Sequence, residues 1–335
     1  MGGSTIGIGV IGLGFMGRIH AAAAESARQA GLDCELVSLF DAHVDATRLA
    51  EKADGNIRVG TEEITLERMA ALLKPNLADF LADAGVKLVS ICTPTDSHVE
   101  LASSAMRAGK DVVLEKPVAI TSAAIEGLID VERATGRFCM PAMCMRFWPG
   151  WRWIADRVRD ERFGPLRRLT SERFGTPPTW SREFYLDTSR SGGAVFDLHI
   201  HDVDYVMWVL GLPQTMNVAG TRRSIETTCH YANGGIARLA SGWLENGPPS
   251  YYMRCEAEFE TAVVEWDMRR EVPLTVRRGC RTPESVPMNE PSGYEAQMRH
   301  AIQCVQTGTR PMVTLNDALE ATRWIEREVA ELEGE

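Results

Sequence analysis

The sequence predicts an α/β domain built on a parallel sheet, followed by an α+β domain with a large, mostly antiparallel sheet. Two patterns carry this prediction. Short apolar runs alternate with helical segments up to about residue 144, whereas strands separated by tight turns dominate after Pro149. The length of 335 residues also exceeds what one hydrophobic core usually serves. We therefore expect domains at residues 1–144 and 145–335.

The first domain is expected to alternate buried parallel strands with helices, because its apolar runs are short and nearly continuous. Gly109 and Gly136 suit the C-terminal ends of two of these helices. The expected strands are Ile6–Ile11, Glu35–Phe40, Lys87–Cys92, Asp111–Glu115 and Phe138–Met143. The expected helices are Arg18–Gln29, Ser97–Ala108 and Ala123–Ala134.

The second domain is expected to hold consecutive strands joined by turns. Asn233-Gly234-Gly235 is a strong hairpin signal between two of them. The expected strands are Leu166–Phe174, Ile225–Tyr231, Ile236–Trp243, Tyr251–Phe259 and Ala262–Asp267. The expected helices are Val195–Leu210, Tyr294–Thr307 and Asn316–Leu332.

Charge and cysteine content narrow the class of protein. The formal net charge of -10 would repel a phosphate backbone, so we expect no nucleic-acid partner. The eight cysteines form no CxxC pair, and most lie in apolar runs, which indicates packed thiols in a reducing, cytoplasmic compartment. No apolar stretch is long enough to span a membrane, so no membrane association is expected.

A glycine-rich loop follows the first expected strand and opens the first helix. It reads Gly12-Leu13-Gly14-Phe15-Met16-Gly17. Gly12 permits a tight turn, Gly14 lets the backbone approach a pyrophosphate, and Gly17 lets the helix pack closely on the strand. Phe15 and Met16 precede the expected helix, whose N-terminus offers N–H groups and a positive dipole end to the phosphates. The loop therefore predicts that the α/β domain is a dinucleotide-binding Rossmann domain.

Asp41 ends the second expected strand, 24 positions after Gly17. A carboxylate there can accept hydrogen bonds from the ribose hydroxyls of NAD, and it would repel the 2′-phosphate of NADP. NAD is therefore the expected cofactor and NADP is disfavoured. His43 and Arg48 lie nearby and keep NADP open as an alternative. A glycine turn in another kind of doubly wound domain is the purely structural alternative.

Glu115-Lys116-Pro117 stands at the C-terminal end of an expected parallel strand, the edge where open α/β sheets bind ligands. An ammonium group at this edge could hydrogen-bond a substrate hydroxyl and stabilise alkoxide character as a hydride leaves. The alternative is a solvated lysine at a strand end.

The third cluster surrounds Asp197 and His201. If a helix starts by Phe196, these two residues stand at i and i+4 and share a face, and the carboxylate would raise the basicity of the imidazole. Such a pair suits a general base near neutral pH, and His199 would point the opposite way. A capped helix with satisfied polar groups is the structural alternative. Helical geometry scatters the metal-ligand types around the axis, so we expect no metal site from His199, His201, Asp202 and Asp204.

In this order, the motifs resemble the family of glucose–fructose oxidoreductase, inositol dehydrogenase and the rhizopine-catabolism protein MocA. The resemblance runs along nearly the whole chain. Besides the glycine loop and Asp41, it rests on Thr93-Pro94-Thr95-Asp96-Ser97-His98, Glu115-Lys116-Pro117-Val118, Arg146-Phe147-Trp148-Pro149, the segment from Asp197 to His201, and Thr314-Leu315-Asn316-Asp317-Ala318.

The resemblance implies an NAD-dependent oxidoreductase that takes hydride from a secondary alcohol of a sugar, cyclitol or related polyol. It implies a catalytic group of Lys116, Asp197 and His201, and a cis peptide before Pro117. It also implies a homodimer or homotetramer formed through the second-domain sheet. Further residues implied to line the cofactor are Thr93, Pro94, His98, Glu115 and, where cofactor and substrate meet, Arg146.

Two other functions fit the same motifs. Some relatives use tightly held NAD to cleave a glycosidic bond, with no net NADH production. The second alternative is a non-catalytic nucleotide-binding sensor, although such a protein would not need Lys116, Asp197 and His201. The sequence also departs from the family pattern in the longer segment from Gly55 to Asp83, and in His199 where a small residue is more usual. The identity of the substrate is therefore left open.

Overall fold

A computed structural model describes residues 5–44, 49, 64–178, 181–244, 251–288 and 290–334 of the chain. The chain forms two compact units. The first contains Met1–Met143 and Tyr294–Glu320, and the second contains Cys144–Gly293 and Ala321–Glu335. The first crossing between units thus falls beside the expected boundary at residue 144. The segment Tyr294–Glu320 differs from the expectation, because it clusters with the first unit and not with the second.

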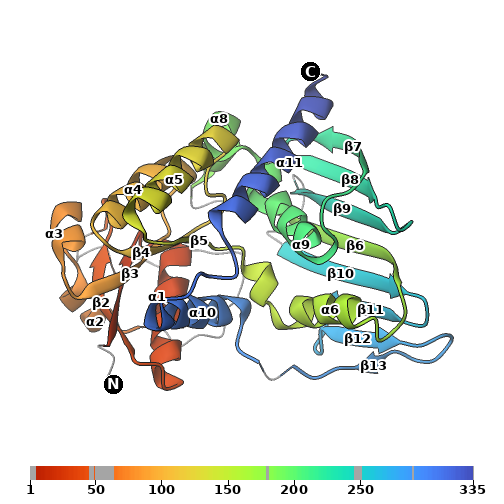
Figure 1. The fold of residues 1–335 in the computed structure, drawn as a ribbon, viewed down its shortest axis with the longest axis horizontal. Coiled ribbons are helices and arrows are strands. Elements are labelled where there is room, and N and C mark those ends of the chain that lie inside the picture. Colours follow the sequence, from red (N-terminus) through yellow and green to blue (C-terminus); the bar gives the residue numbers. More distant parts are fainter. Residues whose placement is uncertain are drawn as a thin grey trace. The chain divides into compact units, whose positions relative to one another are not determined.

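The first unit is built on a five-stranded sheet in the order β2-β1-β3-β4-β5, and every strand pair in it is parallel. This confirms the predicted α/β class. Helix α1 covers one face, and α4 and α5 cover the other (Figure 1), as right-handed crossovers require. The strands are β1 (Ile6–Ile11), β2 (Cys34–Phe40), β3 (Val86–Ile91), β4 (Asp111–Leu114) and β5 (Cys139–Pro141). The helices are α1 (Phe15–Gln29), α2 (Leu66–Leu72), α3 (Leu77–Ala82), α4 (His98–Arg107) and α5 (Ser122–Thr135), with the turn η1 (Thr95–Ser97).

Helix α10 (Gly293–Thr307) packs beside α1, which explains why this late segment joins the first unit. The Ser26 hydroxyl on α1 donates to Glu295 at 2.5 Å and accepts from Arg299 at 3.2 Å. Helix α11 (Leu315–Glu333) then starts in the first unit and ends in the second. Side-chain contacts of this kind join segments far apart in sequence, so strand and helix periodicity could not indicate them.

The second unit is built on an eight-stranded sheet in the order β13-β12-β11-β10-β6-β9-β8-β7. Its neighbours are antiparallel except β6 and β9, which run parallel. The strands are β6 (Leu166–Gly175), β7 (Thr215–Thr221), β8 (Ser224–His230), β9 (Ile236–Trp243), β10 (Tyr251–Phe259), β11 (Val263–Asp267), β12 (Leu274–Arg277) and β13 (Glu284–Ser285). The helices are α6 (Pro149–Asp160), α7 (Arg182–Leu186), α8 (Thr188–Ser191) and α9 (Ile200–Leu210), with the turns η2 (Cys144–Phe147) and η3 (Val195–His199).

The two faces of this large sheet differ in character. Along β10, Met253, Cys255 and Ala257 are buried and alternate with partly exposed charged residues. On the partly exposed face, Arg254 donates to Glu265 and Glu256, both at 2.5 Å. Helices α6, α9 and α11 lie along the sheet in Figure 1. One apolar face and one face of cross-strand ion pairs are typical of an antiparallel sheet.

The expected helix Val195–Leu210 is α-helical only from Ile200 onward. Residues Val195–His199 form one π-helical turn, η3, which is wider than an α-helical turn. The premise that Asp197 and His201 occupy i and i+4 of one α-helix is therefore wrong. Apolar periodicity does not distinguish the two helix types, because it reports which residues are buried and not which carbonyl each N–H meets.

In the part of the chain that the structure describes, no helix combines the length and apolar character that a membrane span needs. Seven of the eight cysteines are buried or half-buried and only Cys280 is exposed, in line with their expected packing as small apolar groups.

Candidate active site

The glycine loop has the backbone geometry that its glycines predict. Gly12 adopts φ +89°, a region that favours glycine. A Cβ added to Gly17 would lie 1.7 Å from the carbonyl oxygen of Gly12, so only glycine lets α1 sit this close to the end of β1. The predicted roles of both glycines in turning and packing thus have a steric cause.

Gly14 is different, because a Cβ added there would meet no atom within 4 Å. The protein's own packing therefore does not require glycine at this position. Gly14 is the N-cap of α1, has no side chain to cap the first turn at Phe15 and Met16, and is followed by no acidic residue in that turn. Open space beside an uncapped helix N-terminus fits the phosphates of a dinucleotide.

Asp41 ties the end of β2 to the glycine loop. One carboxylate oxygen, Oδ2, accepts from the backbone N–H of Leu13 at 2.7 Å, and Oδ1 accepts from the N–H of His43 at 2.8 Å. Oδ1 also accepts from the N–H of Val44 at 3.1 Å, so the second acceptor site of Oδ2 is left for a ribose hydroxyl. Arg48, the neighbour that keeps NADP open, lies outside the described residues.

Lys116 lies two residues after Leu114, the last residue of β4, at the carboxyl edge of the parallel sheet, and is half-buried. The peptide between Lys116 and Pro117 is cis, as the resemblance implies. Glu115 beside it is 6% exposed, and its Oε2 accepts from the backbone N–H of Lys116 at 3.1 Å. Glu115 therefore holds the backbone of the lysine.

His98 connects two segments of the same edge. Its Nε2 lies 2.8 Å from the carbonyl oxygen of Thr93, and its Nδ1 lies 2.8 Å from that of Pro117. Burial lowers the pKa of His98, and the two carbonyl contacts offset part of that effect. With 1% of its surface exposed, His98 orders the segments at Thr93, Pro94 and Pro117. Direct contact between these residues and a cofactor stays a prediction.

A buried cluster around His20 was not predicted from the sequence. His20 lies on α1, with Nδ1 2.5 Å from the Ser90 hydroxyl and Nε2 3.0 Å from Glu115 Oε1. Burial by itself would lower the pKa of His20, but neighbouring Cys92 and Glu115 outweigh it and raise the pKa above 6.5. A histidine within an alanine-rich helix, three residues after Gly17, was the available signal.

In the second unit, Arg146 is 3% exposed and belongs to a buried ion pair. Its Nε and Nη2 donate to the two carboxylate oxygens of Asp204 at 2.9 and 2.6 Å. The guanidinium carbon also lies 5.9 Å from the ring centroid of Trp208. These contacts link η2 to α9, whereas the predicted position of Arg146 at a cofactor–substrate boundary stays a prediction.

Asp197 lies in η3 and is half-buried, while His201 lies in the first turn of α9 and is 9% exposed. The carboxylate of Asp197 accepts from the indole Nε1 of Trp243 at 3.2 Å. Trp243 in turn packs edge-on against Tyr185, with ring centroids 6.4 Å apart. The sequence predicted Trp243 only as the end of a strand. Its hydrogen bond to Asp197 joins residues far apart in the chain, so no local sequence pattern indicates it.

His199 is fully buried in the core of the second unit. Its Nδ1 lies 3.1 Å from the Ser241 hydroxyl, and its Nε2 lies 3.2 Å from a carboxylate oxygen of Glu328. Asp202 is also fully buried and binds Arg173. Across the described ranges, no group of three or more potential ligand side chains is arranged to hold a metal ion.

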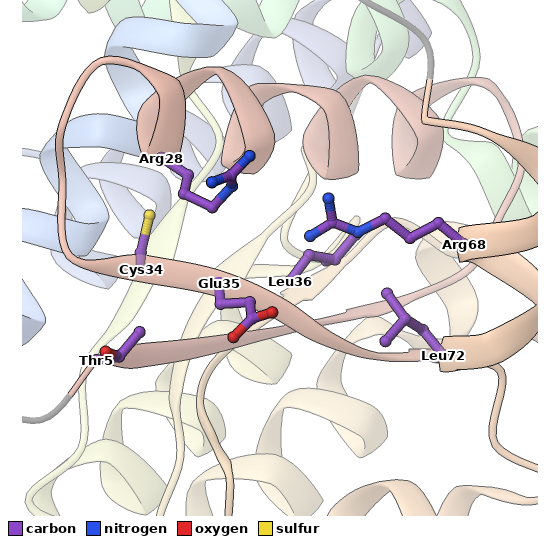
Figure 2. A pocket seen from close by; sticks show the side chains of 7 residues that line it. All are labelled: Thr5, Arg28, Cys34, Glu35, Leu36, Arg68 and Leu72. Carbon is purple, nitrogen blue, oxygen red and sulfur yellow. The ribbon is translucent and has the colours of Figure 1, made fainter.

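Figure 2 shows a cavity of about 430 Å³ in the first unit, lined by residues that include Thr5 and Cys34. These two residues stand at the amino ends of β1 and β2, whereas ligands of open α/β sheets bind at the carboxyl ends. Two arginines reach toward the cavity, but Glu25 pairs with both Arg28 and Arg68. The cavity is therefore separate from the candidate site, and its positive charges are already matched.

The parallel sheet, the glycine loop and the open space at Gly14 define a protein with a dinucleotide-binding domain of the Rossmann class. Residues 6–143 match a family described as an oxidoreductase family with an NAD-binding Rossmann fold. Residues 151–264 match the C-terminal domain of the same GFO/IDH/MocA family. The chain belongs to this family, which confirms the resemblance found in the sequence.

Curated relatives include dehydrogenases of cyclitols. The chain is 25% identical to inositol 2-dehydrogenase of Rhizobium meliloti over 95% of this chain and 94% of the relative. It is 26% identical to the NAD(+)-dependent scyllo-inositol 2-dehydrogenase of Bacillus subtilis over 72% of this chain and 73% of the relative. Among solved structures, UDP-N-acetylglucosamine 3-dehydrogenase of Acidithiobacillus ferrooxidans shares the fold, with a TM-score of 0.76, 21% identity and 98% coverage of both chains.

Substitution of Gly14 and of Gly17 distinguishes a glycine needed for ligand binding from a glycine needed for protein packing. Gly14→Ala should leave the melting temperature unchanged and weaken NAD binding about tenfold or more, roughly 1.4 kcal/mol, because its methyl group enters the open space that is predicted to hold phosphate. Gly17→Ala should instead destabilise the protein by about 1–3 kcal/mol, a typical cost of overpacking. Thermal unfolding and calorimetric titration with NAD measure both. A Gly14→Ala protein that binds NAD like the wild type would contradict this assignment.

The buried His20 should make stability depend on pH. Since its pKa is raised in the folded protein, its stabilising contribution is complete below pH 6.5 and declines as the pH rises above that value. The melting-temperature difference between wild type and His20→Gln should therefore be largest near pH 6 and shrink toward pH 9. A change of 1 kcal/mol corresponds to roughly 2–4 °C in a unit of this size. His230→Gln makes the same substitution at a more exposed histidine and is the control.

Proposed function

We propose that this oxidoreductase uses NAD to oxidise a secondary alcohol of a sugar, cyclitol or related polyol. The observation that carries the proposal is Lys116, held at the carboxyl edge of the sheet by the hydrogen bond from its backbone N–H to Glu115. An ammonium group there suits an alcohol oxygen. The names of the inositol dehydrogenase relatives support a polyhydroxylated substrate.

In the proposed reaction, His201 accepts the proton of the substrate hydroxyl and Lys116 stabilises negative charge on the oxygen. Asp197, anchored by Trp243, binds a neighbouring hydroxyl or orients the histidine. Lys116 belongs to the first unit, and Asp197 and His201 belong to the second. The cofactor, when bound, supplies the hydride acceptor.

The proposed cofactor is NAD and not NADP. Asp41 places a carboxylate at the end of β2, where the negative charge favours two ribose hydroxyls over a 2′-phosphate. Phosphate contacts are proposed for the loop from Gly12 to Gly17, where Gly14 leaves open space. The name of the Bacillus subtilis relative, an NAD(+)-dependent dehydrogenase, supports the same choice.

The catalytic assignment predicts that Lys116→Ala and His201→Ala each lower turnover by about 100-fold or more, while NAD affinity stays nearly unchanged. NADH formation with a panel of inositols, sugars and other polyols measures this. Lys87→Ala and His230→Ala change the same residue types at more exposed positions and should keep wild-type turnover. Wild-type rates in both active-site variants would sink the assignment. NAD retained through gel filtration, with cleavage of a glycoside and no NADH, would identify the alternative reaction.

Asp41→Asn tests the cofactor preference while keeping the contact to the loop, because an asparagine oxygen still accepts from the N–H of Leu13. The amide nitrogen replaces the oxygen that accepts from the N–H groups of His43 and Val44, so the melting temperature of the variant is measured as well. Loss of the charge should reduce the preference for NAD over NADP by about tenfold or more, a change of roughly 1.4 kcal/mol. Titration of both cofactors into wild type and variant measures the ratio. Tighter binding of NADP than of NAD by the wild type would refute the preference itself.

The expected homodimer or homotetramer also remains part of the proposal. Light scattering of the purified protein would measure the mass.

A further inference from the structure

Glu328, in the second half of α11, is fully buried among hydrogen-bond donors. Its Oε1 accepts from the Thr227 hydroxyl at 2.6 Å and from the indole Nε1 of Trp324 at 2.8 Å. The Nε2 atom of His199 lies 3.2 Å from both of its carboxylate oxygens. One carboxylate thus gathers contacts from a strand, its own helix and the turn η3.

The hydrogen bonds around His199 define where its protons lie. The Ser241 hydroxyl donates its single proton to Asp202 at 2.9 Å, so its oxygen accepts from Nδ1 of His199. The opposite ring nitrogen faces the two oxygens of Glu328, and one proton must lie between them to avoid repulsion between lone pairs. The imidazole therefore spans two partners, one on β9 and one on α11.

Charge in this buried group is balanced as well. Burial opposes a charged imidazole, but the adjacent Glu328 outweighs it and raises the pKa of His199. The Asp202 carboxylate accepts from the guanidinium Nη2 of Arg173 at 3.0 Å. With Arg173 paired to Asp202 and one proton shared between His199 and Glu328, the buried network carries no net charge.

The network meets the backbone at a turn of uncommon geometry. His199 is the last residue of the π-helical turn η3, Asp197 lies two residues before it, and His201 lies two residues after it. A π-helical turn contains about one more residue than an α-helical turn and is rare unless other contacts hold it. If η3 relaxed to α-helical bonding, Asp197 would rotate about the helix axis relative to His201.

We propose that Glu328 and His199 are positioning residues that hold η3 in its π-helical form and thereby set the relative orientation of Asp197 and His201. This inference rests on the proposed function, in which the latter two residues act on the substrate. The C-terminal helix α11 thus contributes to the reaction through a side chain that touches neither substrate nor cofactor.

Three variants separate positioning from stability. Glu328→Gln keeps an acceptor for Thr227 and Trp324 and an amide donor for His199, so the link to η3 persists without charge. The double variant His199→Leu/Glu328→Gln leaves no unpaired charge but removes the link. Glu331→Gln makes the same chemical change on the same helix at an exposed position and is the control.

The double variant should melt within a few degrees of Glu328→Gln but lose about tenfold or more in kcat, since small misplacements of reacting groups are costly. Its Kd for NAD should not change, because the glycine loop belongs to the other unit. Hydrogen exchange should rise in peptides spanning residues 194–204 in the double variant alone. Equal kcat and equal exchange in the double variant and in Glu328→Gln would overturn the proposal.

The exchange measurement keeps this test separate from the proposed function. If none of the tested sugars or polyols lets the wild type reduce NAD, the proposed function fails. The hydrogen-exchange comparison alone then decides whether Glu328 and His199 hold η3. If the double variant does not fold, Ser241→Ala replaces it, because Asp202 keeps Ser171 and Arg173 while Nδ1 of His199 loses its acceptor. Wild-type exchange and wild-type kcat in Ser241→Ala would likewise refute the positioning role.

Discussion

The arrangement of the first unit depends on one close approach, that of α1 to the end of β1. Gly17 permits it, because any side chain there would collide with the carbonyl of Gly12. The same approach brings His20, one turn further along α1, to Ser90 and Glu115. Glu115 in turn holds the backbone of Lys116. A steric condition in the loop is thus transmitted through a buried ion pair to the lysine proposed to act on substrate.

The second unit depends on buried charges that meet across elements. Arg146 pairs with Asp204 and Arg173 pairs with Asp202, both deep in the core. Replacing such pairs with apolar residues is often neutral or stabilising, whereas removing one partner costs about 3–5 kcal/mol. These ion pairs are therefore better understood as a source of conformational specificity than of stability. Each pair fixes the orientation of α9, the helix that carries His201.

The sequence predicted most of the long strands and helices well, and it missed several of the remaining ones. The strand Ile6–Ile11 has the predicted bounds, and most other predicted elements end within one or two residues of the observed ones. Strand β7 was missed because it is mostly exposed and carries little apolar alternation. The sequence prediction placed helix α10 in the second domain, whereas it clusters with the first unit. The prediction could not detect this, because the contact between α10 and α1 joins Ser26 to Glu295, which are far apart in the chain.

By itself, the sequence determined the two kinds of sheet and the family, and it located the glycine loop, the acidic residue after the second strand and the lysine at the carboxyl edge of the sheet. These features follow from local rules, since a strand period, a turn and a strand end are each written in a few consecutive residues. Only the tertiary structure decided that Glu115 faces His20, that Asp197 meets Trp243, and that His199 belongs to the core with Glu328. Each of these partners comes from a distant segment, and the balance between burial cost and a matching charge selects it.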